Sequence, residues 1–197
     1  MPVIDFLRHG VTERPGDLAG RTDIALAEEG WRQFERQTAG GAWPAVVASP
    51  LRRARDAAER LGQERGIHVE IDPDWREIDL GDWDGRALVE LRADAATAAL
   101  LARFYRDPTT AEPPNGESFG SLSARVARAL GRLADRENGA LVVAHAGSIR
   151  TALSLATSIP LSTLWAIRIE PATRIKMQLA RHPQHGRWGE IIEVAQP

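Results

Sequence analysis

Short apolar runs mark three candidate strands, at residues 3–7, 45–48 and 140–144. Each run is too short for a typical helix, and two of them are rich in β-branched residues, a pattern that favours buried parallel strands. Residues 67–71 instead alternate apolar and polar positions, which predicts a strand nearer the edge of the same sheet.

Helical patterns separate these runs. The second of the predicted helices is expected to open at Ser49, a capping residue, with Pro50 at its first position, and to end before Gly66. The expected helices cover residues 27–37, 49–65, 119–136 and 148–157. Because strands alternate with helices, the pattern predicts an α/β protein with a mainly parallel sheet.

The C-terminal part of the chain departs from this alternation. Residues 165–179 and 188–194 flank a polar turn at 182–186, and we expect an antiparallel hairpin at the sheet edge. Residues 84–116 are rich in alanine and then in proline, which favours a helical insertion over the sheet. With 197 residues in all, the chain is expected to form a single domain.

Composition removes several classes of protein. The absence of cysteine excludes a disulfide framework, a cysteine nucleophile, a zinc–thiolate site and an iron–sulfur cluster. The formal net charge of −2 gives no global electrostatic case for nucleic acid or an anionic membrane. No apolar run approaches the ~18 residues that cross a bilayer, and no targeting segment opens the chain. We therefore expect a soluble, cytoplasmic protein.

Polar clusters follow each of the three apolar runs. The first run ends at Arg8-His9-Gly10, the second at residues 49–53 and the third at His145. In an open parallel sheet, ligands bind beyond the carboxyl ends of the strands, so two histidines and at least two arginines are expected to converge on one crevice. All but one of the 25 basic residues are arginines. This excess reflects either genome composition or forked, permanently charged donors placed around an anionic substrate.

Such a crevice suits phosphoryl chemistry. Arginine forks match phosphate oxygens in geometry and charge, and nearby arginines keep an imidazole neutral and therefore nucleophilic. A leaving alkoxide then needs a proton from a carboxylic acid. Residues 75–85 supply four candidates for that acid, namely Glu77, Asp79, Asp82 and Asp84.

Five elements of the chain, in this order, resemble those of the histidine phosphatase superfamily, the phosphoglycerate-mutase-like enzymes. They are the Arg-His-Gly element at residues 7–13, Ser-Pro-Leu-x-Arg-Ala at 49–54, Glu-x-x-x-Gly-x-Trp-Asp-Gly at 77–85, the Gly-Glu-Ser step at 114–118 and the second-histidine element at 142–150. The resemblance implies a three-layer α/β/α fold with an antiparallel edge near the C-terminus and residues 86–118 as a cap-like insertion over the active site.

The resemblance also implies residue roles. His9 is expected to be the phosphorylated nucleophile and Glu77 the proton donor, with Arg8, Arg53 and His145 around the phosphoryl group. No metal and no cofactor is expected, and the implied partner is a small phosphomonoester bound by a monomer or homodimer. The residues expected to bind phosphate or substrate are Arg8, Gly10, Thr12, Gly20, Arg21, Thr22, Arg53, His145 and Ala146.

Departures from the family pattern bear on the reaction. Pro15 stands where many members carry an asparagine, so one side-chain phosphate donor is absent there. Residues 145–147 read His-Ala-Gly, without the asparagine typical of mutases, and the insertion has no adjacent arginine pair, which favours a phosphatase. Residues 20–26 look like the Gly-x-Thr-Asp segment of α-ribazole phosphatases. A phosphoglycerate-mutase-type transferase and an inactive phosphoester-binding member stay as alternatives.

Three further features have two interpretations each. Glu117 either complements the dipole of the helix that follows it or belongs to the site. His182 and His185 are expected at a solvated hairpin tip, against a metal pair as the alternative. Arginines recur at helical spacing at 125, 128, 132 and 136, where a solvated face is favoured over a stripe for nucleic acid.

Overall fold

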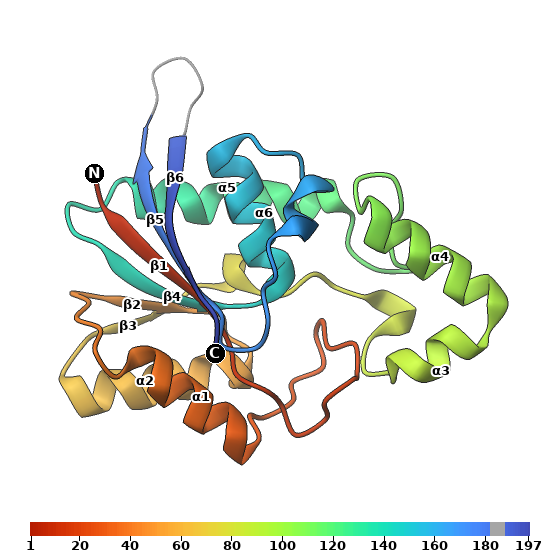
Figure 1. The fold of residues 1–197 in the computed structure, drawn as a ribbon, viewed down its shortest axis with the longest axis horizontal. Coiled ribbons are helices and arrows are strands. Elements are labelled where there is room, and N and C mark those ends of the chain that lie inside the picture. The colour runs from red at the N-terminus through yellow and green to blue at the C-terminus, as the bar shows by residue number, and fades with distance from the viewer. Residues whose placement is uncertain (182–187) are drawn as a thin grey trace.

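A mixed six-stranded sheet forms the centre of the computed structural model, which describes residues 1–181 and 188–197 (Figure 1). Its strands are β1 (Val3–Arg8), β2 (Val46–Ala48), β3 (Val69–Ile71), β4 (Ala140–Ala144), β5 (Arg174–Ala180) and β6 (Trp188–Ala195). The order is β3-β2-β4-β1-β5-β6. Strands β3, β2, β4 and β1 run parallel to one another, β5 is antiparallel to β1, and β6 is antiparallel to β5. The predicted parallel sheet with an antiparallel C-terminal edge is confirmed.

Helices cover both faces of this sheet (Figure 1). They are α1 (Glu28–Thr38), α2 (Arg52–Arg65), α3 (Leu88–Ala93), α4 (Ala95–Arg106), α5 (Phe119–Ala134) and α6 (Ala146–Thr157). Successive strand residues point to opposite faces, so Leu7 packs in one cluster with Phe34 of α1, whereas Phe6 packs in another with Val126 of α5. The fold therefore has three α/β/α layers, as predicted.

The insertion consists of α3 and α4 and extends to one side of the sheet (Figure 1). Leu91 and Leu101 are buried in the cluster that also holds Phe6, and the rings of Trp83 and Phe104 meet edge-on with centroids 5.7 Å apart. The insertion is thus packed on the main core through apolar side chains. No helix in the described ranges is both long and apolar enough to cross a bilayer.

Two predicted boundaries were wrong. Helix α2 begins at Arg52, not at Pro50, because the Ser49 hydroxyl accepts from the Leu51 amide (3.3 Å) and contacts a buried imidazole instead of capping the helix. The first strand of the hairpin begins at Arg174, since residues 163–166 form a 3-10 turn. The expected turn, with His182 and His185, lies outside the described residues.

The basic stripe on α5 is matched by acidic side chains. Arg125 pairs with Glu117, Arg128 with Asp74, Arg132 with Asp72 and Asp74, and Arg136 with Glu70. Each arginine of the stripe therefore has an acidic partner. Arg128 is 60% exposed, as expected of a solvated face, whereas Arg125 is only 13% exposed and does not belong to one.

Candidate active site

His9 follows the last residue of β1 and is 8% exposed. Its Nδ1 lies 2.7 Å from the Gly10 carbonyl oxygen, and because a carbonyl only accepts, Nδ1 carries the proton and Nε2 is the basic ring nitrogen. Burial, and then the charges of Arg53 and Arg8, hold the pKa of His9 well below the usual range of a histidine. The ring is therefore neutral at pH 7 with a free lone pair on Nε2.

His145 lies at the N-cap of α6 and is fully buried beside His9, with ring centroids 5.1 Å apart. Arg53 Nε donates to its Nδ1 (3.2 Å), so its Nε2 carries the proton and donates to Ser49 Oγ (2.7 Å). Burial and the charge of Arg53 also lower the pKa of His145 well below its usual range. Both ring nitrogens thus contact protein atoms, and His145, which was expected beside the phosphoryl group, does not line the cavity described below.

Two guanidinium groups, a buried one on Arg53 and a half-buried one on Arg8, lie near His9. Arg53 is 1% exposed and donates to the carbonyls of Thr22 (2.9 Å), Ala19 (2.8 Å) and Gly20 (3.0 Å). Arg8 donates to the Ile169 carbonyl (2.8 Å). Burial lowers the pKa of both arginines, yet an arginine stays protonated at neutral pH. Two fixed cations are therefore oriented by neutral carbonyl groups.

Glu77 is placed by the first turn of α6. Its Oε2 accepts from the Gly147 amide (3.0 Å) and its Oε1 from the Ile78 amide (2.9 Å). A Cβ atom at Gly147 would lie 2.3 Å from Glu77 Oε1, so only glycine admits the carboxylate there. The two amides therefore fix the direction of the Glu77 carboxyl group.

Glu77 is the one of the four predicted acids that lines the main cavity. Asp79 pairs with Arg21 (3.0 Å), and Asp82 accepts from the Asn115 amide group (3.0 Å). Asp84 accepts from the Gly20 and Thr22 amides (2.7 and 2.8 Å) and from the Thr22 hydroxyl (3.0 Å). These three aspartates hold loops, whereas Glu77 faces the space beside His9.

The cavity that joins these groups has a volume of about 690 Å³. Its reactive end holds Arg8, His9, Arg53 and Glu77, with Gly10, Thr12 and Ala146 also in its lining. The insertion and α5 contribute an apolar wall that includes Leu88, Phe104, Tyr105, Phe119 and Leu122. The predicted residues of β1, α2 and the Glu77 loop therefore meet in one cavity.

Residues 20–22 lie elsewhere. The carbonyls of Gly20 and Thr22 accept hydrogen bonds from Arg53. The Arg21 side chain pairs with Asp79 beside a second, smaller pocket. None of the three lines the main cavity. The segment thus orients Arg53 through backbone atoms and does not contribute to the wall of the main cavity.

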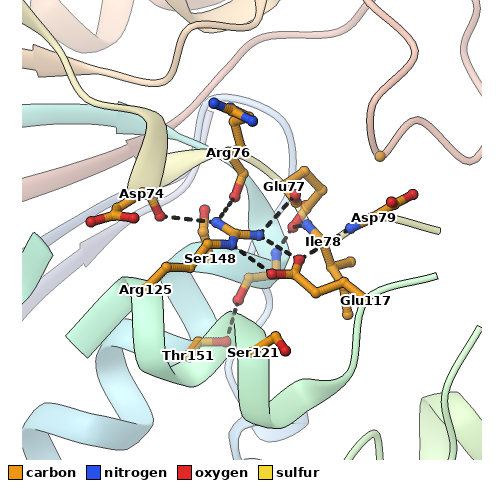
Figure 2. A network of polar contacts seen from close by, with 12 residues as sticks. Asp74, Arg76, Glu77, Ile78, Asp79, Glu117, Ser121, Arg125, Ser148 and Thr151 are labelled. Carbon is orange, nitrogen blue, oxygen red and sulfur yellow. Dashed lines mark hydrogen bonds and ion pairs between the residues drawn. The ribbon is translucent and has the colours of Figure 1, made fainter. Parts of the chain in front are cut away.

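Arg125 secures the backbone around Glu77, a role that its sequence position on a basic stripe did not reveal (Figure 2). Its Nη1 donates to the carbonyls of Asp74 (2.9 Å) and Arg76 (2.7 Å), and its Nη2 donates to the Glu77 carbonyl (3.0 Å). Nε and Nη2 also bind both carboxylate oxygens of Glu117 (2.8 and 2.7 Å). Glu117 in turn accepts from the Asp79 amide (3.3 Å), so it belongs to the support of the site.

Comparisons with known proteins agree with this geometry. A curated relative from Mycobacterium tuberculosis, described as a bifunctional protein, is 36% identical over 177 residues, which are 85% of this chain and 48% of that protein. The chain thus spans about half the length of that relative. Glucosyl-3-phosphoglycerate phosphatase from the same species is 33% identical over 172 residues, or 80% of this chain and 76% of that enzyme.

Two further comparisons extend the likeness. Adenosylcobalamin/alpha-ribazole phosphatase from Salmonella typhimurium is 30% identical over 173 residues, 84% of each chain. The solved structure of mycobacterial glucosyl-3-phosphoglycerate phosphatase superposes with a TM-score of 0.85 at 27% identity, covering 98% of this chain and 97% of that one. The sequence model of the family described as "Histidine phosphatase superfamily (branch 1)" matches residues 4–188. The chain therefore belongs to branch 1 of the histidine phosphatase superfamily.

Proposed function

We propose that this protein hydrolyses phosphomonoesters through a phosphohistidine at Nε2 of His9. The observation that carries the proposal is a neutral imidazole, fixed in its tautomer by the Gly10 carbonyl, in one cavity with Arg8, Arg53 and Glu77. A nucleophile, two fixed cations and one carboxyl group are the parts that such a reaction requires.

In the first step, His9 Nε2 attacks phosphorus and the bond from phosphorus to the ester oxygen breaks. Protonated Glu77 gives its proton to the departing oxygen, so the product is a neutral alcohol. Arg8 and Arg53 stabilise the charge that spreads over the phosphoryl oxygens in the transition state. Because both guanidiniums are held by carbonyl oxygens, they need little reorganisation during the reaction.

In the second step, water attacks the phosphohistidine. The Glu77 carboxylate takes a proton from that water, the phosphorus–nitrogen bond breaks and inorganic phosphate leaves. His145 is assigned a supporting role: it keeps Arg53 in place through Nδ1 while Ser49 fixes its tautomer. His9 returns to its starting state, so the cycle closes without another reactant.

A trapping experiment tests this proposal. Incubation with a phosphomonoester labelled in its phosphate, followed by an alkaline quench, should leave a labelled protein that is stable to alkali and labile to acid. His9→Asn should lose the label and the activity together while keeping its thermal unfolding temperature. Full activity in folded His9→Asn would refute the assignment, and label transfer to a second hydroxyl acceptor instead of water would favour a mutase.

The physiological substrate is the finer part of the proposal. The relatives named above act, by their names, on α-ribazole phosphate and on glucosyl-3-phosphoglycerate, and we propose a substrate from one of these two chemistries. A panel with both esters, 3-phosphoglycerate, nucleotides and sugar phosphates ranks them by kcat/KM. A nucleotide or an unrelated sugar phosphate at the top of that ranking would exclude both.

A further inference from the structure

Arg150 is a half-buried arginine on α6 that lines the same cavity as His9. Its guanidinium carbon lies 4.2 Å from the centre of the Trp165 ring, which fixes the plane of the group. Its Nε is buried without a hydrogen-bond partner, and Arg150 has no ion pair within residues 1–181 and 188–197. A guanidinium in a cavity wall without an anionic partner is costly unless a ligand supplies one.

Most other arginines around the cavity have partners. Arg14 pairs with Asp17, Arg168 pairs with Glu170, and Arg53 is held by carbonyl groups. Arg92 is exposed, and Arg8 donates to the Ile169 carbonyl at the reactive end. Burial, and then the like charge of Arg8, lower the pKa of Arg150, while the charges of Glu77 and Glu170 oppose that shift. Arg150 is therefore a half-buried cation with no directly paired anion in the described part of the protein.

Arg150 lies between the reactive end of the cavity and its apolar wall. It is within electrostatic reach of Arg8 and Glu77 at the reactive end and of Tyr105 on α4. Its stacking partner Trp165 contacts the Tyr105 ring, with centroids 5.8 Å apart. Arg150 thus belongs to the side of the cavity where the insertion meets η3 (Thr163–Ala166), the side that a leaving group would occupy.

We propose that Arg150 binds a carboxylate on the leaving group of the substrate. A single guanidinium with an immobilised plane matches the planar, two-oxygen fork of a carboxylate. This inference rests on the proposed function, because it places the phosphoryl group of the ester at the reactive end and the leaving group beside Arg150. It makes acidic phosphomonoesters the favoured substrate class over neutral ones.

Matched esters test this assignment. 3-Phosphoglycerate and glycerol 1-phosphate differ in one carbon, which is a carboxylate in the first and a hydroxymethyl group in the second. The wild type should prefer the acidic ester about 10- to 100-fold in kcat/KM, the range of a charge-assisted pair. Arg150→Gln should reduce that ratio to about one, whereas Arg103→Gln, at an exposed position of α4 outside the cavity lining, should leave it unchanged.

Each remaining outcome decides the question. A ratio that Arg150→Gln does not change overturns the proposal, and so does an equal loss on both esters, which would assign Arg150 to the phosphoryl group. Calorimetric titration of both esters into His9→Asn, with and without Arg150→Gln, reads the same preference without turnover. A preference in binding with no hydrolysis by the wild type would refute the proposed function and retain the carboxylate site.

A different observation concerns the Glu77 loop (Figure 2). The Arg125 contacts described above use all five N–H groups of a side chain that is only 13% exposed. Three of those contacts go to the backbone at 74, 76 and 77, so the direction of the Glu77 side chain depends on Arg125. We infer that Arg125 is a positioning residue for Glu77, with Glu117 holding Arg125.

Leaving-group dependence tests this second inference. Arg125→Lys and Glu117→Gln should slow first-turnover alcohol release from an alkyl phosphate about 10- to 100-fold, because a misplaced acid donates its proton poorly. p-Nitrophenol release should fall far less, since that leaving group needs no proton. Arg128→Gln, which removes an arginine one helical turn away that is 60% exposed, is the matched control. Equal losses on both esters in a folded variant would make Arg125 merely structural and overturn the inference.

Discussion

Replacing Gly147 by alanine perturbs the site without disturbing the core. The added Cβ would lie 2.3 Å from Glu77 Oε1 and 3.1 Å from its Cδ, so the carboxylate must move by about 1 Å to reach ordinary contact. That movement also breaks the 3.0 Å hydrogen bond from the Gly147 amide to Oε2. A displacement of about 1 Å in a reacting group costs roughly 10²-fold in rate. We therefore expect kcat to fall about 100-fold with alkyl phosphates.

Stability should barely respond to the same change. The clash involves the end of a flexible side chain, and alanine is a better helix former than glycine by up to about 1 kcal/mol. Gly120→Ala is the matched control, because it lies in the first turn of α5 with its nearest neighbour at 3.7 Å. Steady-state kinetics and thermal unfolding of both variants decide the matter. A Gly147→Ala protein with wild-type kcat would refute the placement of Glu77 as proton donor.

Three further predictions concern the groups behind the reactive end. Arg53→Lys leaves the carbonyls of residues 19, 20 and 22 short of donors, and we expect a loss of about 1–3 kcal/mol in urea unfolding together with at least a tenfold loss in kcat/KM. Asp84→Asn removes the charged acceptor for the Gly20 and Thr22 amides, so kcat/KM should fall about tenfold without loss of the phosphohistidine label. The folded pKa values of His9 and His145 are depressed, so the unfolded chain binds more protons than the folded one. The free energy of unfolding is therefore highest above about pH 6.5 and falls as the pH drops below that value. Urea titrations from pH 8 to 5 should show this fall, and His145→Gln should make it smaller.

The predicted site residues lie close together because they obey a topological rule. His9 and His145 directly follow β1 and β4, and Arg53 opens the helix after β2, so the carboxyl edge of the sheet brings them together. The spacing to the Gly-x-Trp element selected Glu77 from its neighbours, and the cavity lining agrees with that choice. The fold class followed from the same alternation of strands and helices.

The supporting groups had no comparable signal. Arg125 and Arg128 share one helical repeat, yet Arg125 reaches three loop carbonyls and Arg128 a single surface aspartate. Ser49 was predicted to cap a helix because the sequence does not show that its hydroxyl contacts His145, which follows β4. Residues 20–22 hold Arg53 and Asp84 largely through backbone carbonyls and amides, which the residue types do not reveal. These roles depend on tertiary proximity and backbone geometry, which neither spacing nor composition encodes.

The choice of partners for the buried arginines bears directly on function. Had Arg8 and Arg53 been ion-paired to carboxylates, an incoming phosphoryl group would have had to displace those anions and leave them buried and unpaired. Their hydrogen bonds instead go to backbone carbonyls and to His145, which orient the guanidiniums without cancelling their charge. Of the acids in the described cavity lining, Asp17 and Glu170 are each paired to exposed arginines, and Glu77 is held by two amides. The cavity consequently keeps an excess of positive charge that only an anionic ligand balances, and that excess is what allows fixed arginines to stabilise a phosphoryl transition state.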